Sequence, residues 1–460
     1  MTRSLTLDTC ADALTTGRVS AHDLLERCFA RIAESGEDAS RIFIELNADD
    51  AYRAADEQHR LRRQGRAPSR FAGIPFSVKD IFDVQGQRTR SGSICREHIA
   101  PAQATAPAVQ RLLSAGMIQV GRTNMTEFAY SGLGLNPHFG VPPNHWGAPG
   151  AFAPGGSSSG AASSVRMEMA LFGLGTDTGG SCRIPAAFQG LTGYKPTASS
   201  VSLAGVVPLS PSLDSVGPIA PTVRCCADIW RTLSGTPNRA SGPATRSESP
   251  TLFVPDNVVM TDSDTTVARD FETALSTLSR RGWTIRAGAL PFLEDIVALN
   301  ARGGYPAYES YRLYGELVKN RGRDMDPRVA SRILRGETLS DDYAEALGTL
   351  RKAAIQSFDQ IFRDHDAVAF PTVAITPPLL SDLESDNAYF SINALVLRNT
   401  ALVNFLDGCS ISIPMHEPGS APTGFMLSAR SGDDQTLLHL AEDAEGILRT
   451  RQHNDLYTIA

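Results

Sequence analysis

The stretch GLGTDTGGSCRIP, residues 173–185, follows a second glycine- and serine-rich stretch, PGGSSSG, residues 154–160. Clustered glycines let several backbone N–H groups converge on one small anionic group. That group is either a phosphate or the oxyanion that develops during acyl transfer. These two stretches therefore predict an anion-binding loop, and the residues around them decide between the two ligands.

Outside these stretches, the apolar residues alternate between strand and helix patterns. Alternation over residues 74–79 predicts a strand that carries Ser77 and Lys79 on the face opposite its apolar side chains. A helix near residues 108–115 and a strand at 117–120 are predicted next. The order strand, helix, strand is typical of a doubly wound α/β core.

The rest of the chain continues this alternation. Ser20 and Asp23 form a predicted capping box at the start of an amphipathic helix. Further strands are predicted at residues 252–254, 283–285 and 367–370, and further helices at 266–280, after Ser340, and at 433–448.

Composition narrows the class of protein. The 460 residues include 43 Lys and Arg against 50 Asp and Glu, a net charge of −7, with 42% hydrophobic and 20% charged residues. These values exclude disordered, collagen-like and coiled-coil chains, and the length alone suggests about three domains. The mildly acidic balance argues against binding to nucleic acid or to an anionic membrane surface. Residues 1–20 contain no apolar run typical of a signal peptide, so a cytoplasmic protein is expected.

The cysteines and histidines suggest neither structural disulfides nor a metal site. The seven cysteines are scattered and odd in number, which favours free thiols in a reducing compartment. The closest histidine pair, His138 and His145, lacks a metal-binding helix motif, and the segment 364–366 is typical of a solvated turn. We therefore expect neither a metal nor a cofactor.

Residues 128–165 contain no charged side chain but many glycines, prolines and serines. The prolines exclude a membrane helix, and long irregular stretches inside compact domains are usually functional. This composition favours a neutral or partly apolar substrate.

The residues next to the glycines favour acyl transfer over phosphate binding. No glycine is followed directly by lysine, and no complete dinucleotide-binding pattern is present. Ser181 provides a hydroxyl nucleophile beside the glycine N–H donors, and no histidine pairs with it obviously. Lys79 is the candidate base, because burial can lower the pKa of a lysine towards neutrality.

These segments together resemble the amidase signature family, whose members hydrolyse amides with a Ser, cis-Ser, Lys triad. The resemblance rests on GIPFSVKD at residues 73–80 and on the two glycine-rich stretches. It implies Lys79 as general base and acid, Ser157 as the bridging serine on a cis peptide, and Ser181 as nucleophile. It also implies an oxyanion hole built from the N–H groups of Thr178, Gly179, Gly180 and Ser181.

The resemblance extends over nearly the whole chain and has two departures. Family-like segments occur at residues 121–128, 193–197, 214–218, 370–372 and 422–425. Arg166 stands where a small residue is usual, and Cys182 where a branched aliphatic residue or Met is usual. The resemblance implies one α/β domain over residues 1–460, with a mixed twisted sheet covered by helices on both faces. Within it we expect a helical part (1–70), a catalytic core (71–235), a surface loop (236–250) and the remainder (251–460).

The expected function is hydrolysis of a small amide, or of a carbamoyl, urea or urethane relative, through an acyl-enzyme on Ser181. One alternative is the glutaminase subunit of a tRNA-dependent amidotransferase, which usually carries Gln at the position of Ile184. Another is a non-catalytic phosphate-binding or scaffold protein. The expected partner is a small-molecule amide, and a homo-oligomer is left open.

The expected neighbours of the nucleophile fall into two groups. Asp177 and Arg183 bracket Ser181 and are expected to clamp its loop rather than to contact substrate. The expected pocket walls are Asn124, Met125, Tyr130 and Cys182.

Overall fold

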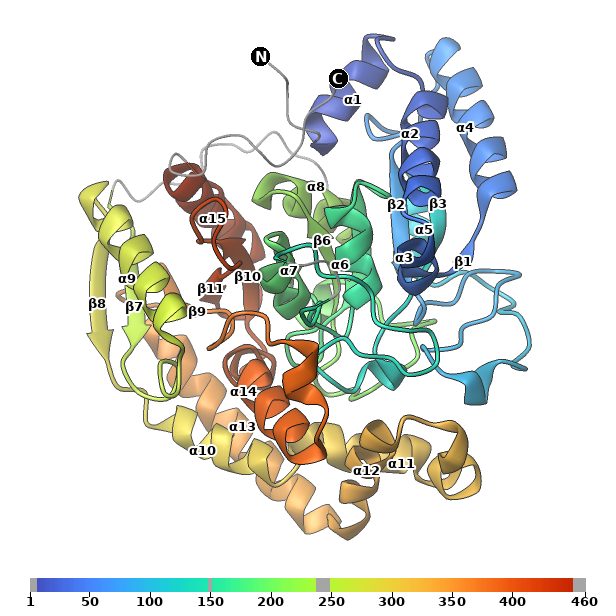
Figure 1. Cartoon of the computed structure of the whole chain (residues 1–460). Coiled ribbons are helices and arrows are strands. Elements are labelled where there is room, and N and C mark those ends of the chain that lie inside the picture. The colour runs from blue at the N-terminus through green and yellow to red at the C-terminus, as the bar shows by residue number, and fades with distance from the viewer. Residues whose placement is uncertain (1–5, 148–150, 237–248, 450–460) are drawn as a thin grey trace.

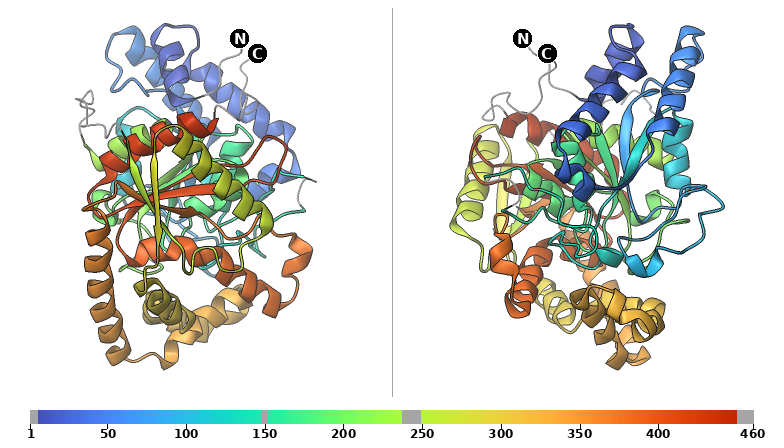
Figure 2. Two further views of the ribbon diagram at one scale, coloured as in Figure 1. Left: turned by 90° about the vertical axis from the view of Figure 1, so that its left-hand side faces the viewer. Right: turned by 45° about the vertical axis from the view of Figure 1, so that its right-hand side comes forward.

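A mixed sheet runs through the middle of the computed structural model, which describes residues 6–147, 151–236 and 249–449 (Figure 1). Its strands are β1 (Phe43–Leu46), β2 (Pro75–Lys79), β3 (Ile118–Thr123), β4 (Phe172–Thr176), β5 (Thr192–Lys195), β6 (Val216–Ala220), β7 (Thr251–Pro255), β8 (Thr284–Gly288), β9 (Ala367–Pro371), β10 (Cys409–Pro414) and β11 (Gly424–Ala429). Helices lie on both sides of this sheet (Figure 2), which confirms the predicted fold class.

The helices among the described residues include long and short ones. They are α1 (Leu7–Thr15), α2 (Ala21–Glu34), α3 (Glu37–Ile42), α4 (Ala48–Arg63), α5 (Pro107–Ser114), α6 (Ser159–Arg166), α7 (Arg183–Gln189), α8 (Val223–Ser234), α9 (Thr265–Arg280), α10 (Phe292–Ala301), α11 (Gly304–Arg321), α12 (Pro327–Leu334), α13 (Asp341–Ile361), α14 (Asp386–Phe405) and α15 (Asp434–Arg449). Short 3-10 turns are η1 (Ile94–Arg96), η2 (Glu127–Ala129), η3 (Ala198–Ser200), η4 (Gly322–Asp324), η5 (Arg335–Thr338) and η6 (Leu380–Leu383). No described helix combines the length and the apolar character that crossing a bilayer requires.

The strand order is β1-β3-β2-β4-β6-β5-β10-β11-β9-β7-β8. Strand β2 pairs in parallel with β3 and β4, and β7 pairs in parallel with β8 and β9. The remaining pairs are antiparallel. Because β2 and β4 are parallel neighbours, their carboxyl ends meet at the same edge of the sheet, and the residues that follow them come together there.

Most predicted elements are present, with bounds that differ by a few residues. The capping box of Ser20 and Asp23 starts α2 as predicted. All five residues of strand β2 are buried, so Ser77, on the face opposite the apolar side chains, is covered as well. Helix α6 covers this part of the sheet, and the hydroxyls of Ser77 and Ser164 lie 2.8 Å apart. The predicted surface loop at 236–250 lies almost entirely outside the described residues.

A group of helices, α10 to α13, lies beside α14 at one end of the molecule (Figure 1). Side chains from α10, α12 and α14 face the loop that joins β4 to α7, with a cavity between them. This arrangement places the C-terminal half of the chain opposite the glycine-rich loops, and it defines the site described next.

Candidate active site

Lys79 ends strand β2 and is fully buried. Its Nζ donates to Ser157 Oγ at 2.7 Å and to Thr176 Oγ1 at 2.8 Å. Burial lowers the pKa of Lys79 to about 8, because the charged ammonium is removed from water. A substantial fraction of this lysine is therefore neutral near pH 8, with a lone pair able to take a proton.

Ser157 lies in the loop before α6, and the Gly156–Ser157 peptide bond is cis. Its carbonyl accepts a hydrogen bond from the Thr126 N–H at 3.1 Å. The next residue joins the two glycine-rich stretches, because the Ser158 N–H donates to the Ser181 carbonyl at 3.2 Å. The structure thus brings together the three segments that carry Lys79, Ser157 and Ser181.

The loop between β4 and α7 is held by a buried ion pair. Arg183 donates Nη2 to Asp177 Oδ1 at 2.9 Å and Nε to Asp177 Oδ2 at 3.0 Å, and neither side chain is exposed. Burial alone would raise the pKa of Asp177, but the Arg183 charge and its hydrogen bonds outweigh that effect and lower the pKa. The clamp expected from the sequence is present, with Asn404 as a further partner of both side chains.

One of the expected oxyanion donors is already hydrogen-bonded to the Asp177 carboxylate. The Gly180 N–H donates to Asp177 Oδ1 at 2.8 Å, so it is committed to the loop and does not face the cavity. Thr178, Gly179 and Ser181 line the cavity, and no acceptor for their N–H groups is found among the described residues. The candidate oxyanion hole is therefore reduced to these three donors.

Thr178 is fixed by a second buried carboxylate. Its hydroxyl donates to Asp214 Oδ1 at 2.5 Å, and the same carboxylate accepts the N–H groups of Leu209 and Ser210. Burial raises the pKa of Asp214 to about 6. This contact orients Thr178, the first of the candidate oxyanion donors.

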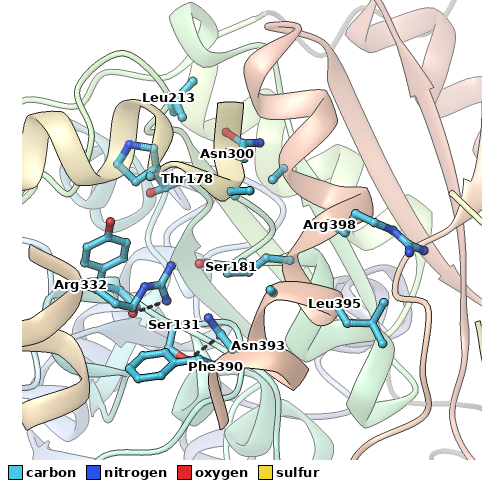
Figure 3. Close-up of a pocket in the computed structure, with 18 of the residues that line it drawn as sticks. Ser131, Thr178, Ser181, Leu213, Asn300, Arg332, Phe390, Asn393, Leu395 and Arg398 are labelled. Carbon is cyan, nitrogen blue, oxygen red and sulfur yellow. Dashed lines mark hydrogen bonds between the residues drawn. The ribbon is translucent and has the colours of Figure 1, made fainter. Parts of the chain in front are cut away.

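The cavity has a volume of about 540 Å³, which is sufficient for a small organic molecule. Ser181 lies on its wall between the helices that carry Arg332 and Arg398 (Figure 3). Ser181 is only 3% exposed, so little of it is in contact with bulk water. The cavity wall thus presents the Ser181 hydroxyl and three N–H groups, and the amine of Lys79 lies outside the lining, in contact with Ser157.

Of the four expected pocket residues, the structure places one at the cavity. Tyr130 lines the cavity, but Asn124, Met125 and Cys182 do not. The Asn124 amide donates to the carbonyls of Arg41, Phe139 and Gly140, which makes it a loop anchor. Met125 and Cys182 are fully buried in the core, where the Cys182 thiol donates to the Gly217 carbonyl at 3.5 Å.

Several cavity residues were missed by sequence reasoning. They include Ser131, Arg332, Arg335, Asn393 and Arg398. They come from a loop, from α12 and the turn after it, and from α14. No local motif marks them, since only tertiary packing brings them to Ser181.

Comparison with known proteins identifies relatives over nearly the full length. The family model described as Amidase matches residues 23–438. A 2-amino-5-chloromuconic acid deaminase from Comamonas testosteroni is 33% identical over 392 residues, 84% of each chain. A subunit of the glutamyl-tRNA(Gln) amidotransferase from Symbiobacterium thermophilum is 31% identical over 461 residues, 92% of this chain and 93% of that protein. A solved structure described as an amidase is 28% identical, with a TM-score of 0.87, and covers 96% of this chain and 100% of that one.

Proposed function

The chain belongs to the amidase family and is a hydrolase of amide C–N bonds, and we propose that it acts through an acyl-enzyme on Ser181. The observation that carries this proposal is the contact of 2.7 Å between the buried amine of Lys79 and the hydroxyl of Ser157. The loop of Ser157 is joined in turn to the loop of Ser181. These contacts support Ser181 as the nucleophile, Lys79 as the base and Ser157 as the hydroxyl that relays the proton between them.

In the proposed acylation, neutral Lys79 takes the proton of Ser157 while Ser157 takes the proton of Ser181. The Ser181 oxygen attacks the amide carbon, and the N–H groups of Thr178, Gly179 and Ser181 stabilise the resulting oxyanion. Loss of one such donor typically costs about 3 kcal/mol of barrier. The lysine returns its proton through Ser157 to the leaving nitrogen, and the C–N bond breaks.

Deacylation uses the same groups in reverse order. A water molecule attacks the Ser181 ester, its proton passes to Lys79 through Ser157, and the carboxylic acid leaves as Ser181 regains its proton. The relative from Comamonas testosteroni is named a deaminase, which supports ammonia as the leaving group here. We also propose a cytoplasmic location. The seven cysteines are free and buried, which is typical of proteins in a reducing compartment.

The second candidate is a glutaminase that works within an amidotransferase, because one component of such an enzyme is 31% identical over most of the chain. The residue after Arg183 argues against it, since Ile184 stands where such glutaminases usually carry Gln. Ammonia release from glutamine by this chain, with no release from simple aliphatic amides, would favour the glutaminase.

Labelling with a fluorophosphonate probe tests the proposed nucleophile. Intact mass spectrometry should show one adduct on the wild type and on Cys182→Ala, and none on Ser181→Ala. The same three proteins should release ammonia from a panel of primary amides in the same pattern. An adduct that survives in Ser181→Ala but disappears in Cys182→Ala would overturn the assignment of Ser181.

A further inference from the structure

The cavity beside Ser181 has an excess of positive charge. Its charged lining residues are Arg332, Arg335, Arg398 and Asp262. No ion pair to any of these three arginines is found within the described ranges. The arginines come from outside the uncharged stretch 128–165, so the cavity does not have the neutral character that this stretch suggested.

Two of these arginines are directed elsewhere. Arg398 donates to the backbone carbonyls of Thr261 and Val259, and its side chain points away from Ser181 (Figure 3). Arg335 is exposed and donates to the Ala301 carbonyl at 2.7 Å. Neither arrangement aims the guanidinium at the nucleophile.

Arg332 differs from both. Its guanidinium carbon lies 4.1 Å from the centroid of the buried Tyr130 ring, and its Nη1 donates to the Tyr130 carbonyl at 2.9 Å. A guanidinium has five N–H donors, and the bond to this carbonyl uses one of them. Stacking on Tyr130 holds the planar group in place with donors left for a ligand.

Asn393 supplies a second donor on the same side of the cavity. Its Oδ1 accepts the Ser131 hydroxyl at 2.9 Å and the Gly132 N–H at 2.9 Å. Ser131 in turn accepts the Tyr389 hydroxyl at 2.8 Å, which directs the serine proton to Asn393. Because both lone pairs of Oδ1 are used, the amide orientation is determined and the Nδ2 group must face the other way. Figure 3 shows that group pointing towards the cavity beside Arg332.

We propose that Arg332 and Asn393 bind a carboxylate of the substrate, so that the hydrolysed amide is the monoamide of a dicarboxylic acid. This proposal rests on the proposed function, because it places the substrate amide at Ser181. Arginine and an amide N–H₂ both donate to carboxylate oxygens, and the charged hydrogen bonds are the stronger ones. The Arg332 guanidinium and the Asn393 Nδ2 group have no anionic partner among the described residues, so a substrate carboxylate would accept their remaining hydrogen bonds.

Binding to the Ser181→Ala variant tests this proposal without turnover. Isothermal titration calorimetry would compare succinamate, glutaramate and adipamate with butanamide, pentanamide and hexanamide, which are neutral amides of the same chain lengths. We expect at least one monoamide to bind about 30-fold more tightly than its neutral counterpart, as charged hydrogen bonds typically provide.

Substitutions in the same background identify the residues responsible. Arg332→Met and Asn393→Asp should each weaken monoamide binding about tenfold or more and leave neutral amides unchanged. Asn393→Asp keeps an acceptor for Ser131 and Gly132 but replaces the donor with a negative charge. Arg332→Lys should retain part of the preference. Arg286→Met, an exposed change on β8 with the same loss of charge, is the matched control and should bind like the parent.

Three results would overturn the carboxylate site: equal binding of charged and neutral amides, no binding of any monoamide, or a preference that survives both cavity substitutions. A monoamide preference in Ser181→Ala would stand even if the wild type hydrolysed none of these amides, which would count against the proposed function alone. Conversely, equally fast ammonia release by the wild type from all three monoamides and their neutral counterparts would retain the amidase and reject the carboxylate site.

Discussion

Arg183 binds Asp177 through two hydrogen bonds, of 2.9 and 3.0 Å, and both side chains are completely buried. The same carboxylate accepts the N–H groups of Gly180 and Cys182, on either side of Ser181. One ion pair therefore determines the conformation of the loop that carries the nucleophile. The first prediction follows from this arrangement.

Replacing Asp177 with Asn should destabilise the protein strongly. The substitution leaves the Arg183 charge buried without its partner, and breaking a buried pair in this way typically costs about 3 to 5 kcal/mol. Urea denaturation of Asp177→Asn and wild type measures the difference. Asp50→Asn is the control, because Asp50 pairs with Arg53 at an exposed position and should leave the midpoint unchanged. Equal midpoints for both variants would show that the pair does not hold the loop.

The activity should rise with pH through a limb near pH 8. The proposed base is neutral Lys79, and burial lowers its pKa to about 8, so the neutral fraction grows as the pH rises through that value. Below the limb, kcat/KM should fall about tenfold per pH unit. Initial rates from roughly pH 6 to 10 measure this limb, and a profile that is flat over the whole range would contradict the role of Lys79.

Replacing Lys79 with Arg should reduce kcat/KM by about 10² to 10⁴-fold, because the guanidinium stays protonated and cannot take a proton. The variant keeps a positive charge at the site, so its loss of activity separates proton transfer from simple charge. A rate close to that of the wild type, in a protein with an unchanged melting temperature, would exclude Lys79 as the base.

Thr176 is a positioning residue whose role is visible in the same pH profile. Its hydroxyl accepts a hydrogen bond from Lys79 Nζ at 2.8 Å, and that bond is stronger when the amine is charged. Thr176→Val removes the acceptor while keeping the shape of the side chain, so the pKa of Lys79 should fall and the limb should move below pH 8. A purely structural role would lower the rate at every pH and leave the position of the limb unchanged.

Local sequence patterns predicted the sheet and the glycine-rich loops better than they predicted the cavity. Period-two patterning predicted strand β2, and clustered glycines predicted the loop around Ser181. Each pattern lies within a short stretch of sequence, so it can be recognised without knowledge of the tertiary structure. Asn124 shows the limit of this approach. It was expected in the pocket wall, but its amide donates to three backbone carbonyls. A sequence does not show which side of a residue faces a cavity.

The charged and polar residues of the cavity were unpredictable for a related reason. Arg332 and Asn393 lie on α12 and α14, far along the chain from Ser181, and neither belongs to a motif. They reach the site only because α10 to α12 fold beside α14 (Figure 1), and side chains from these four helices line the cavity. Long-range packing of this kind leaves no periodic signal in the residues that it brings together.

Cys182 should prove dispensable for catalysis although it adjoins the nucleophile. Burial raises the pKa of its thiol well above the ordinary value, which keeps the unreactive thiol form at every pH of interest. The side chain donates to the Gly217 carbonyl and does not line the cavity, so neither substrate nor reagent reaches it. Iodoacetamide should therefore leave amide hydrolysis by the native enzyme unchanged over an incubation that alkylates an exposed thiol. Cys182→Ala should keep kcat/KM within about threefold of the wild type and lose about 1 kcal/mol of stability through the small cavity it creates. Rapid inactivation by iodoacetamide that a primary amide substrate prevents would place the thiol in the site and contradict the burial argument.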